Sequence, residues 1–305
     1  MFGLLNLNKP KGLTSRDAVN RVQWLVRHAE GEGGKPISKK RASKVGHAGT
    51  LDPIATGVLV VCIGPATRLI EHVQRMPKRY RGTFLLGQRS PSDDVELEPE
   101  SLTDPPVPTR EQIGKALPAF VGEIEQVPPA YSAIKIDGQK AYDLARAGDA
   151  PEMKPRPVTI HRLEVVRYEY PELVLDIRCG SGTYIRSLGR DLAASLGTAA
   201  VMSGLARTAI GDFVIDHGVD PRTLDEASLA NAMIRPEAAV ADLQRVDLTA
   251  GEAALVRAGR PIAPRDDLTP RELAMFTPEG ELLALGKKKR GGQLWPVRVF
   301  RAGNG

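Results

Sequence analysis

The sequence predicts an α+β fold in two parts, a larger domain over residues 1–240 and a smaller one over residues 245–305. A chain of 305 residues is long enough to bury one substantial core and a second, smaller one. Its 42% hydrophobic and 26% charged residues are typical of a globular protein. Helix-like and strand-like apolar patterns both occur, no internal repeat is present, and the pattern changes near residue 240.

The N-terminal region predicts a helix, a loop and a strand. Thr14-x-x-Asp17 is typical of a capping box, and apolar residues at helical spacing follow over residues 18–26. Residues 31–44 are polar and basic, so a mobile loop is expected there. A glycine-punctuated loop over residues 46–57 then leads into the apolar run at residues 58–63, which reads as a buried strand.

The middle of the chain continues this mixed pattern. The expected elements are a strand at 81–86, an exposed acidic loop at 91–108, short helices at 110–120 and 139–147, and strands at 158–169 and 172–179. Ser181 or Thr183 is expected to cap a helix that follows residue 183.

The last 60 or so residues predict a small unit of mixed helix and strand. Thr249-x-x-Glu252 begins a helix, residues 273–276 and 282–285 read as a hairpin, and residues 295–300 read as a strand. The turn at residues 287–290 is basic.

Composition and motifs exclude several classes of protein. No apolar run approaches the roughly 18 residues of a membrane span, and residues 1–10 lack the layout of a signal peptide, so a cytoplasmic location is expected. Cys62 and Cys179 each end an apolar run and are expected to be buried, reduced thiols. No zinc-ligand spacing, Walker-type loop or dinucleotide fingerprint occurs.

The charge pattern favours a polyanionic partner. The net charge is +5 and the isoelectric point is near 9.2. Basic clusters occur at residues 35–44, 75–81 and 287–290, whereas acidic residues concentrate between residues 93 and 104. A single basic run is usually a solvated loop, but three such runs that are expected to flank the same candidate site favour nucleic acid.

The loop at residues 46–57 holds the best candidate for a catalytic group. Asp52 follows Gly46 and Gly49 and precedes Gly57. It lies directly before Pro53, which disfavours a helical conformation at Asp52. A carboxylate held on a stiff loop beside a buried strand is suited to act as a nucleophile or general base. An Asp-Pro pair by itself more often forms a simple turn.

A second candidate follows residues 180–183. Arg186 and Arg190 are four residues apart near the start of a predicted helix, so both project from one face. The helix dipole disfavours cations at this end, which indicates an anionic partner for each guanidinium.

Six separated motifs resemble the TruB family of pseudouridine synthases, which modify the T arm of tRNA. They occur in the same order, at residues 8–15, 46–57, 78–81, 131–135, 182–186 and 205–207. The resemblance covers residues 3–240, and it implies a pseudouridine synthase fold with a mixed, mainly antiparallel sheet. Residues 245–305 are similar to a PUA domain, and a packing unit without an RNA role is the alternative. Ala48 replaces the usual Thr, and residues 90–94 depart from the common Thr-Asp-Thr pattern, although Asp94 matches.

The resemblance implies roles for individual residues. Asp52 acts on a flipped-out uridine 55 as nucleophile or base, Arg186 pairs with it, and Tyr80 stacks on the uracil. Tyr184 and Leu205 line the base pocket, and His47 stacks within the RNA loop. The insertion at 131–157 closes over the RNA. The lysines expected to contact RNA are Lys9, Lys135, Lys140, Lys287 and Lys288.

The expected enzyme is therefore a tRNA pseudouridine-55 synthase without metal, cofactor or obligate protein partner. The isomerisation is redox-neutral and transfers no phosphate, so it requires no such cofactor. Two alternatives remain. One is a pseudouridine synthase of another RNA specificity, and the other is an RNA-folding chaperone that reuses the fold.

Overall fold

A computed structural model describes residues 1–33, 35–132, 134–136, 138–141, 144, 147–148, 151–265, 272–289 and 291–300. Within these residues the main feature is a nine-stranded sheet with the central order β1-β3-β12-β4-β11-β10-β7. β13 pairs with β12 and β2 pairs with β3. The strands are β1 Gly3–Lys9, β2 Val45–His47, β3 Ala55–Ile63, β4 Lys78–Leu86, β7 Gly122–Gln126, β10 Arg156–Glu169, β11 Glu172–Cys179, β12 Ala200–Ile210 and β13 Phe213–Val214.

The sheet is mixed and mainly antiparallel, as predicted. Its parallel pairing joins β12 to β3, where Leu205 lies opposite Ala55 and Arg207 lies opposite Gly57. Alternate residues of β3 enter two different cores: Val58, Val60 and Cys62 face one, and Leu59, Val61 and Ile63 face the other. This burial on both faces explains why the strand is a continuous apolar run.

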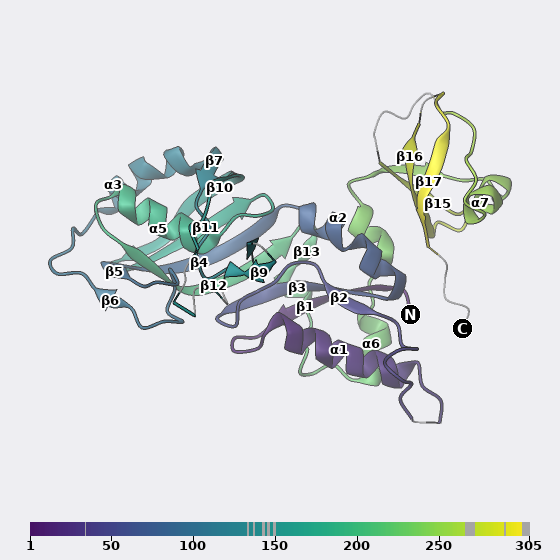
Figure 1. Ribbon diagram of the computed structural model, residues 1–305, viewed down its shortest axis with the longest axis horizontal. Helices are drawn as coiled ribbons and strands as arrows, with labels where there is room; N and C mark the ends of the chain where they lie inside the picture. Colours follow the sequence, from purple (N-terminus) through teal and green to yellow (C-terminus); the bar gives the residue numbers. More distant parts are fainter. Residues whose placement is uncertain are drawn as a thin grey trace.

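Helices cover the sheet in separate groups (Figure 1). α1 (Ser15–Ala29) and α6 (Glu226–Ala232) pack on β1 and β3, while α5 (Ile185–Ser195) and α3 (Arg110–Ala116) pack near β4, β11 and β10. The expected capping box of α1 is present, because Thr14 accepts from the backbone of Asp17 and the Asp17 carboxylate accepts from the backbone of Thr14. α5 approaches β4 closely, since a Cβ on Gly189 would lie 2.1 Å from the Phe84 ring.

The C-terminal region forms a second, four-stranded sheet in the order β14-β15-β16-β17. Its elements are β14 Gln244–Asp247, α7 Ala250–Arg257, β15 Leu273–Phe276, β16 Leu282–Lys288 and β17 Leu294–Val299. The predicted capping box, hairpin and last strand are confirmed.

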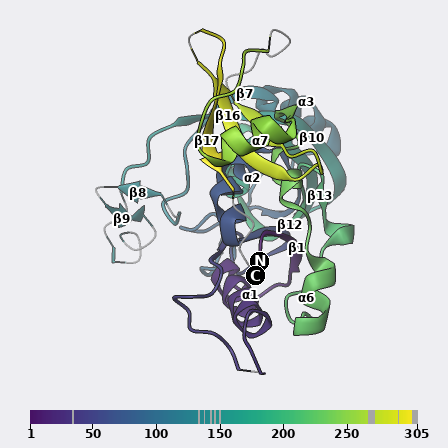
Figure 2. The same ribbon diagram turned by 90° about the vertical axis from the view of Figure 1, so that its right-hand side faces the viewer.

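This second sheet lies at one end of the N-terminal part (Figures 1 and 2). Apolar side chains pack between the two. Phe276, Leu282 and Phe300 belong to the same buried cluster as Leu69 and Val73, from η1 (Gly64–Leu69) and α2 (Ile70–Arg75). The rings of Phe2 and Phe300 stack with centroids 5.6 Å apart.

Two local expectations were wrong. The passage at 91–108 is not uniformly exposed, because Ser92 and Asp94 are 1% and 0% exposed. The helix expected from residue 139 begins later, because Gln139–Lys140 form the strand β9, which pairs with β8 (Lys135–Ile136), whereas residues 141 and 144 are helical. Figure 2 shows this hairpin projecting from the body of the protein. The side chains of Lys135 and Lys140, and much of residues 141–150, lie outside the described residues.

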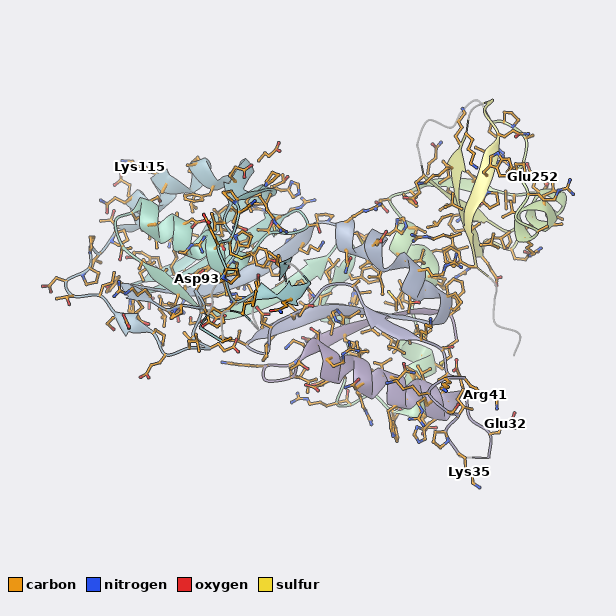
Figure 3. All side chains as sticks on the ribbon, viewed as in Figure 1. Glu32, Lys35, Arg41, Asp93, Lys115 and Glu252 are labelled. Carbon is orange, nitrogen blue, oxygen red and sulfur yellow. The ribbon has the colours of Figure 1, made fainter. Side chains whose placement is uncertain are left out.

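The expectation that all three basic runs flank one site is wrong for the loop after α1, because this loop lies far from Asp93. Figure 3 shows Glu32, Lys35 and Arg41 at the far end of α1 from Asp93. None of the helices in the described ranges is long and apolar enough to cross a bilayer.

Candidate active site

The loop that carries Asp52 is held from both sides. Ser15, the first residue of α1, accepts from the N–H of Leu51 at 2.8 Å and donates to its carbonyl at 3.0 Å. On the other side Arg207 donates to the carbonyls of Val58 at 2.8 Å and Gly49 at 3.0 Å. These contacts hold the backbone on each side of Asp52 while leaving its side chain 40% exposed.

Glycine is required where β3 leaves this loop. Gly57 has φ +99°, and a Cβ there would lie 2.3 Å from the backbone oxygen of Arg207. The glycine therefore allows β12 to pair closely with β3 directly after the Asp52 loop.

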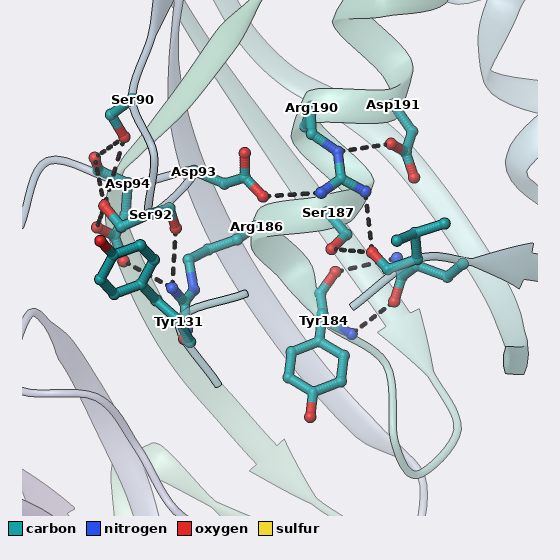
Figure 4. A network of polar contacts seen from close by, with 12 residues as sticks. Ser90, Ser92, Asp93, Asp94, Tyr131, Tyr184, Arg186, Ser187, Arg190 and Asp191 are labelled. Atoms are coloured by element: carbon teal, nitrogen blue, oxygen red, sulfur yellow. Dashed lines mark hydrogen bonds and ion pairs between the residues drawn. The ribbon is translucent and has the colours of Figure 1, made fainter. Parts of the chain in front are cut away.

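The predicted contact between Arg186 and Asp52 is present. Arg186 Nη2 lies 3.3 Å from Asp52 Oδ2, and the arginine side chain is 9% exposed. Its guanidinium also contacts Asp94 Oδ2 at 3.2 Å and donates to the carbonyls of Ser92 at 2.8 Å and Tyr131 at 2.9 Å (Figure 4). Because these contacts hold the Arg186 guanidinium on several sides, its orientation toward Asp52 is fixed.

Asp94 is the partner whose importance the sequence did not reveal. Its Oδ1 accepts from the Ser92 hydroxyl at 2.6 Å and from the N–H of Glu96 at 3.0 Å, and its side chain is fully buried. A buried carboxylate requires such pairing. The available signal was its match to a family position, but the acidic, proline-rich surroundings indicated an exposed loop.

Arg190 also has the anionic partner that the helix dipole argument predicted. Arg190 Nη1 lies 2.8 Å from Asp93 Oδ2, and Nε lies 2.8 Å from Asp191 Oδ1. Its Nη2 donates to the carbonyl of Val127 at 2.9 Å.

The expected cap of α5 was wrong. Tyr184 is the N-cap residue and makes no side-chain capping bond, and the Thr183 hydroxyl donates to the carbonyl of Gly180. The Gln126 amide from β7 instead accepts from the N–H of Tyr184 at 2.8 Å and donates to its carbonyl at 3.0 Å. The start of α5 is thus held by a neighbouring strand, a long-range contact that local sequence does not reveal.

Five predicted residues line one cavity of about 560 Å³: Asp52, Tyr80, Tyr184, Arg186 and Leu205. They come from the Asp52 loop, β4, α5 with its cap, and β12. Burial raises the pKa of both Tyr80 and Tyr184, so each hydroxyl keeps its proton at neutral pH. The cavity therefore combines one partly exposed carboxylate with two neutral hydroxyls and a paired guanidinium.

Comparison with known proteins identifies the family. Residues 37–185 match the N-terminal domain of the TruB family pseudouridylate synthases, and residues 243–301 match the domain described as tRNA pseudouridine synthase II, C terminal. The tRNA pseudouridine synthase B of Caulobacter sp. (strain K31) is 39% identical, over 98% of this chain and 96% of its own length. The protein of the same name from Arthrobacter sp. (strain FB24) is also 39% identical, over 100% and 98% of the two chains. The chain belongs to the TruB family.

A solved structure supports the same fold. The Cbf5-Nop10-Gar1 complex contains a chain that is 25% identical with a TM-score of 0.72, over 98% of this chain and 84% of that one. An H/ACA RNP bound to a substrate RNA is 23% identical with a TM-score of 0.71 and agrees in fold.

The structure also places two of the residues that are expected to contact RNA. His47 lies in β2, outside the wall of the cavity, and burial lowers its pKa, so the ring is neutral at neutral pH. Its stacking within the RNA loop stays a prediction. Lys9 is wrong as an RNA contact, because it is 0% exposed and its ammonium donates to the carbonyls of Pro10 at 3.1 Å and Leu13 at 2.6 Å. Burial lowers the pKa of Lys9 to about 8, opposed by attraction to Asp52.

The predicted C-terminal lysines of this TruB protein lie at the end of β16. Lys287 is exposed. Lys288 donates to the carbonyl of Arg265 at 3.3 Å, and the ammonium of the next residue, Lys289, lies 4.3 Å from the centre of the Trp295 ring. Contacts within the protein therefore already involve Lys288 and Lys289, although Lys289 is exposed like Lys287.

Proposed function

We propose that this chain isomerises uridine 55 in the T arm of tRNA to pseudouridine, with Asp52 acting on a flipped-out nucleotide. The observation that carries the proposal is the cavity at Asp52. The partly exposed carboxylate of Asp52 contacts Arg186 and shares the cavity with Tyr80. The chain that holds this site is 39% identical to a tRNA pseudouridine synthase B over nearly its whole length.

The reaction needs few groups. The bond between ribose C1′ and uracil N1 breaks, a bond between C1′ and C5 forms, C5 loses a proton and N1 gains one. Nothing is oxidised or reduced. The Asp52 carboxylate can attack C1′ or the base, or take a proton from the sugar, and each route needs the ionised acid that Arg186 pairs with.

The cavity also fits a base that has left its stack. The Tyr80 ring offers an apolar face, and its neutral hydroxyl can donate to a uracil oxygen. Tyr184 and Leu205 complete the walls. We propose that the insertion at 131–157 and residues 245–305 hold the surrounding RNA, and that the enzyme works in the cytoplasm.

The test uses the purified chain and a T-arm stem-loop carrying tritium at C5 of uracil. Formation of the new C–C bond expels this hydrogen, so tritium release without added metal, nucleotide, guide RNA or partner protein is the expected result. Replacing the uridine at position 55 by cytidine should abolish release.

The alternatives give different results. RNA annealing without tritium release would favour a chaperone and contradict the proposal. Release from other RNAs but not from the T-arm stem-loop would indicate another specificity.

A further inference from the structure

Two arginines on α5 form hydrogen bonds and ion pairs with the same two segments, the loop at 90–96 and the segment at 127–131. Arg186 contacts Ser92, Asp94 and the carbonyl of Tyr131, whereas Arg190, one turn later, contacts Asp93 and the carbonyl of Val127. On the loop at 90–96, Asp93 pairs with Arg190 while its two neighbours contact Arg186 (Figure 4). On the segment at 127–131, each arginine contacts one end. Arg186 touches Asp52, but Arg190 does not line the cavity.

Asp93 is held in an unusual conformation. Its φ is +58°, in the left-handed region that residues other than glycine rarely adopt. Its N–H donates to the carbonyl of Ser90 at 3.2 Å, and its carbonyl accepts from Met202 of β12 at 3.0 Å. The carboxylate is only 15% exposed, and burial raises its pKa while Arg190 opposes that shift. Such a conformation persists only where the surroundings hold it.

The segment at 127–131 leads directly into the insertion at 131–157. Arg190 binds the first residue of this segment and Arg186 binds the last, while Ser187 between them donates to the same carbonyl of Val127 at 2.8 Å. Movement of this segment would therefore displace the Tyr131 carbonyl, which is one of the acceptors that hold the Arg186 guanidinium.

We propose that Arg190 and Asp93 form a positioning pair, which holds the loop at 90–96 and the base of the insertion so that Arg186 stays aligned with Asp52. This inference rests on the proposed function. Within the part of the chain that the structure describes, neither Arg190 nor Asp93 lines the cavity or contacts Asp52. It acts because Asp94 and the Tyr131 carbonyl keep their positions only while their neighbours are anchored to α5.

The central test compares Arg190→Gln, Asp93→Asn and the double variant in single-turnover tritium release at saturating T-arm RNA. Each single variant should lose about 10-fold to 100-fold in rate, the range expected when a catalytic group is misplaced by up to about 1 Å. RNA affinity should change less than about 3-fold, because phosphate contacts supply most of it. The double variant should be no slower than Arg190→Gln, because that single change already removes the contact with Asp93, besides those with Asp191 and the Val127 carbonyl.

Matched controls separate positioning from general stability. Arg89→Gln removes an exposed ion pair with Glu100 near the same loop, and Asp191→Asn removes the other carboxylate at Arg190; both should retain the wild-type rate. All rates are measured well below each variant's Tm. Arg190→Lys should recover part of the rate lost in Arg190→Gln, because its ammonium can still pair with Asp93 but replaces a fork that also contacts Asp191 and the Val127 carbonyl. A Lys variant as slow as the Gln variant would overturn the ion pair as the cause.

Hydrogen exchange provides a readout that does not depend on catalysis. Amide exchange at residues 90–96 and 127–131 should rise in Arg190→Gln and stay unchanged in Arg89→Gln. Wild-type rates in both single variants, or unchanged exchange in these two segments, would overturn the positioning role. If the wild-type protein released no tritium, the proposed function would fail, and exchange would still decide the positioning role.

Discussion

The side chain of Ser15 and the backbone of Leu51 exchange two hydrogen bonds across 36 positions of sequence, at 2.8 and 3.0 Å. Ser15 is 3% exposed, and Leu51 directly precedes Asp52. The first turn of α1 thereby fixes the backbone from which the candidate catalytic carboxylate projects.

Ser15→Ala should weaken both folding and activity. The change leaves a buried N–H and a buried carbonyl without their partner, which costs about 1–3 kcal/mol in the free energy of unfolding. Urea denaturation measures this loss, and tritium release should slow because Asp52 is less well placed. Ser195→Ala is the control, since its hydroxyl bonds only within α5. Wild-type stability and rate in Ser15→Ala would contradict the role of this contact.

Asp52→Asn should abolish turnover and leave RNA affinity within a few-fold of the wild-type value. The amide is similar in size but cannot act as a nucleophile or base, whereas phosphate contacts supply most of the affinity. Tritium release and a filter-binding titration measure the two quantities. Release at a tenth of the wild-type rate or more would remove Asp52 as the essential group.

Two substitutions at Tyr80 separate its ring from its hydroxyl. Tyr80→Phe should retain binding and lose rate, because the ring still stacks but no longer donates a hydrogen bond. Tyr80→Leu should lose both. Single-turnover rates and RNA titrations distinguish them. A fully active Tyr80→Phe variant would show that the hydroxyl has no role in catalysis and would leave stacking as the role of Tyr80.

Stability should rise between about pH 7.5 and 9. Burial lowers the pKa of Lys9 and of Lys78 to about 8, against 10.5 in the unfolded chain. In this window the unfolded chain holds protons that the folded chain has released, so the free energy of unfolding increases with pH. Above pH 9 the trend should weaken, because burial raises the pKa of Cys62 to about 12 and of Cys179 to about 11.

Urea denaturation across this range checks the sign. Lys78→Met should flatten the rise, whereas Lys115→Met, at an exposed lysine, should leave it unchanged. A free energy of unfolding that falls from pH 7.5 to 9 would contradict the lowered pKa of both lysines.

Replacing Lys287, Lys288 and Lys289 together by Gln should weaken binding of whole tRNA. Each phosphate that the protein no longer neutralises reduces the slope of log affinity against log salt by about 0.7–0.9. Because Lys288 and Lys289 already have contacts within the protein, a reduction of about one to two is expected. The kcat on a T-arm hairpin should not change. An unchanged slope would mean that the turn does not touch RNA.

Much of the fold is readable from the sequence because its signals are local. The capping boxes at Thr14 and Thr249 identify where α1 and α7 begin, and the unbroken apolar run of β3 indicates its burial between two cores. The contact between Arg186 and Asp52 was also predicted, and it is present at 3.3 Å.

The errors share a physical cause, which is contact between distant segments. Asp94 lies in a stretch of acidic and proline residues and is nevertheless buried, because Arg186 from α5 neutralises it. Lys9 is the last residue of β1, and it can be buried because the carbonyls of Pro10 and Leu13 accept hydrogen bonds from its ammonium. Gln126 caps α5 from another strand. No local pattern in the sequence encodes these partners.

The apolar packing of the C-terminal sheet against α2 has a consequence for how the two parts share one RNA. A domain on a loose tether samples many distances, whereas the stacked rings of Phe2 and Phe300 hold this one at a single separation from the cavity. Once the cavity has taken a nucleotide, the second contact becomes intramolecular, with a high effective concentration for an RNA of matching span. An RNA of another span gains no affinity from the second contact. The enzyme would then select its substrate by the distance between two parts of the RNA as well as by the loop that enters the cavity.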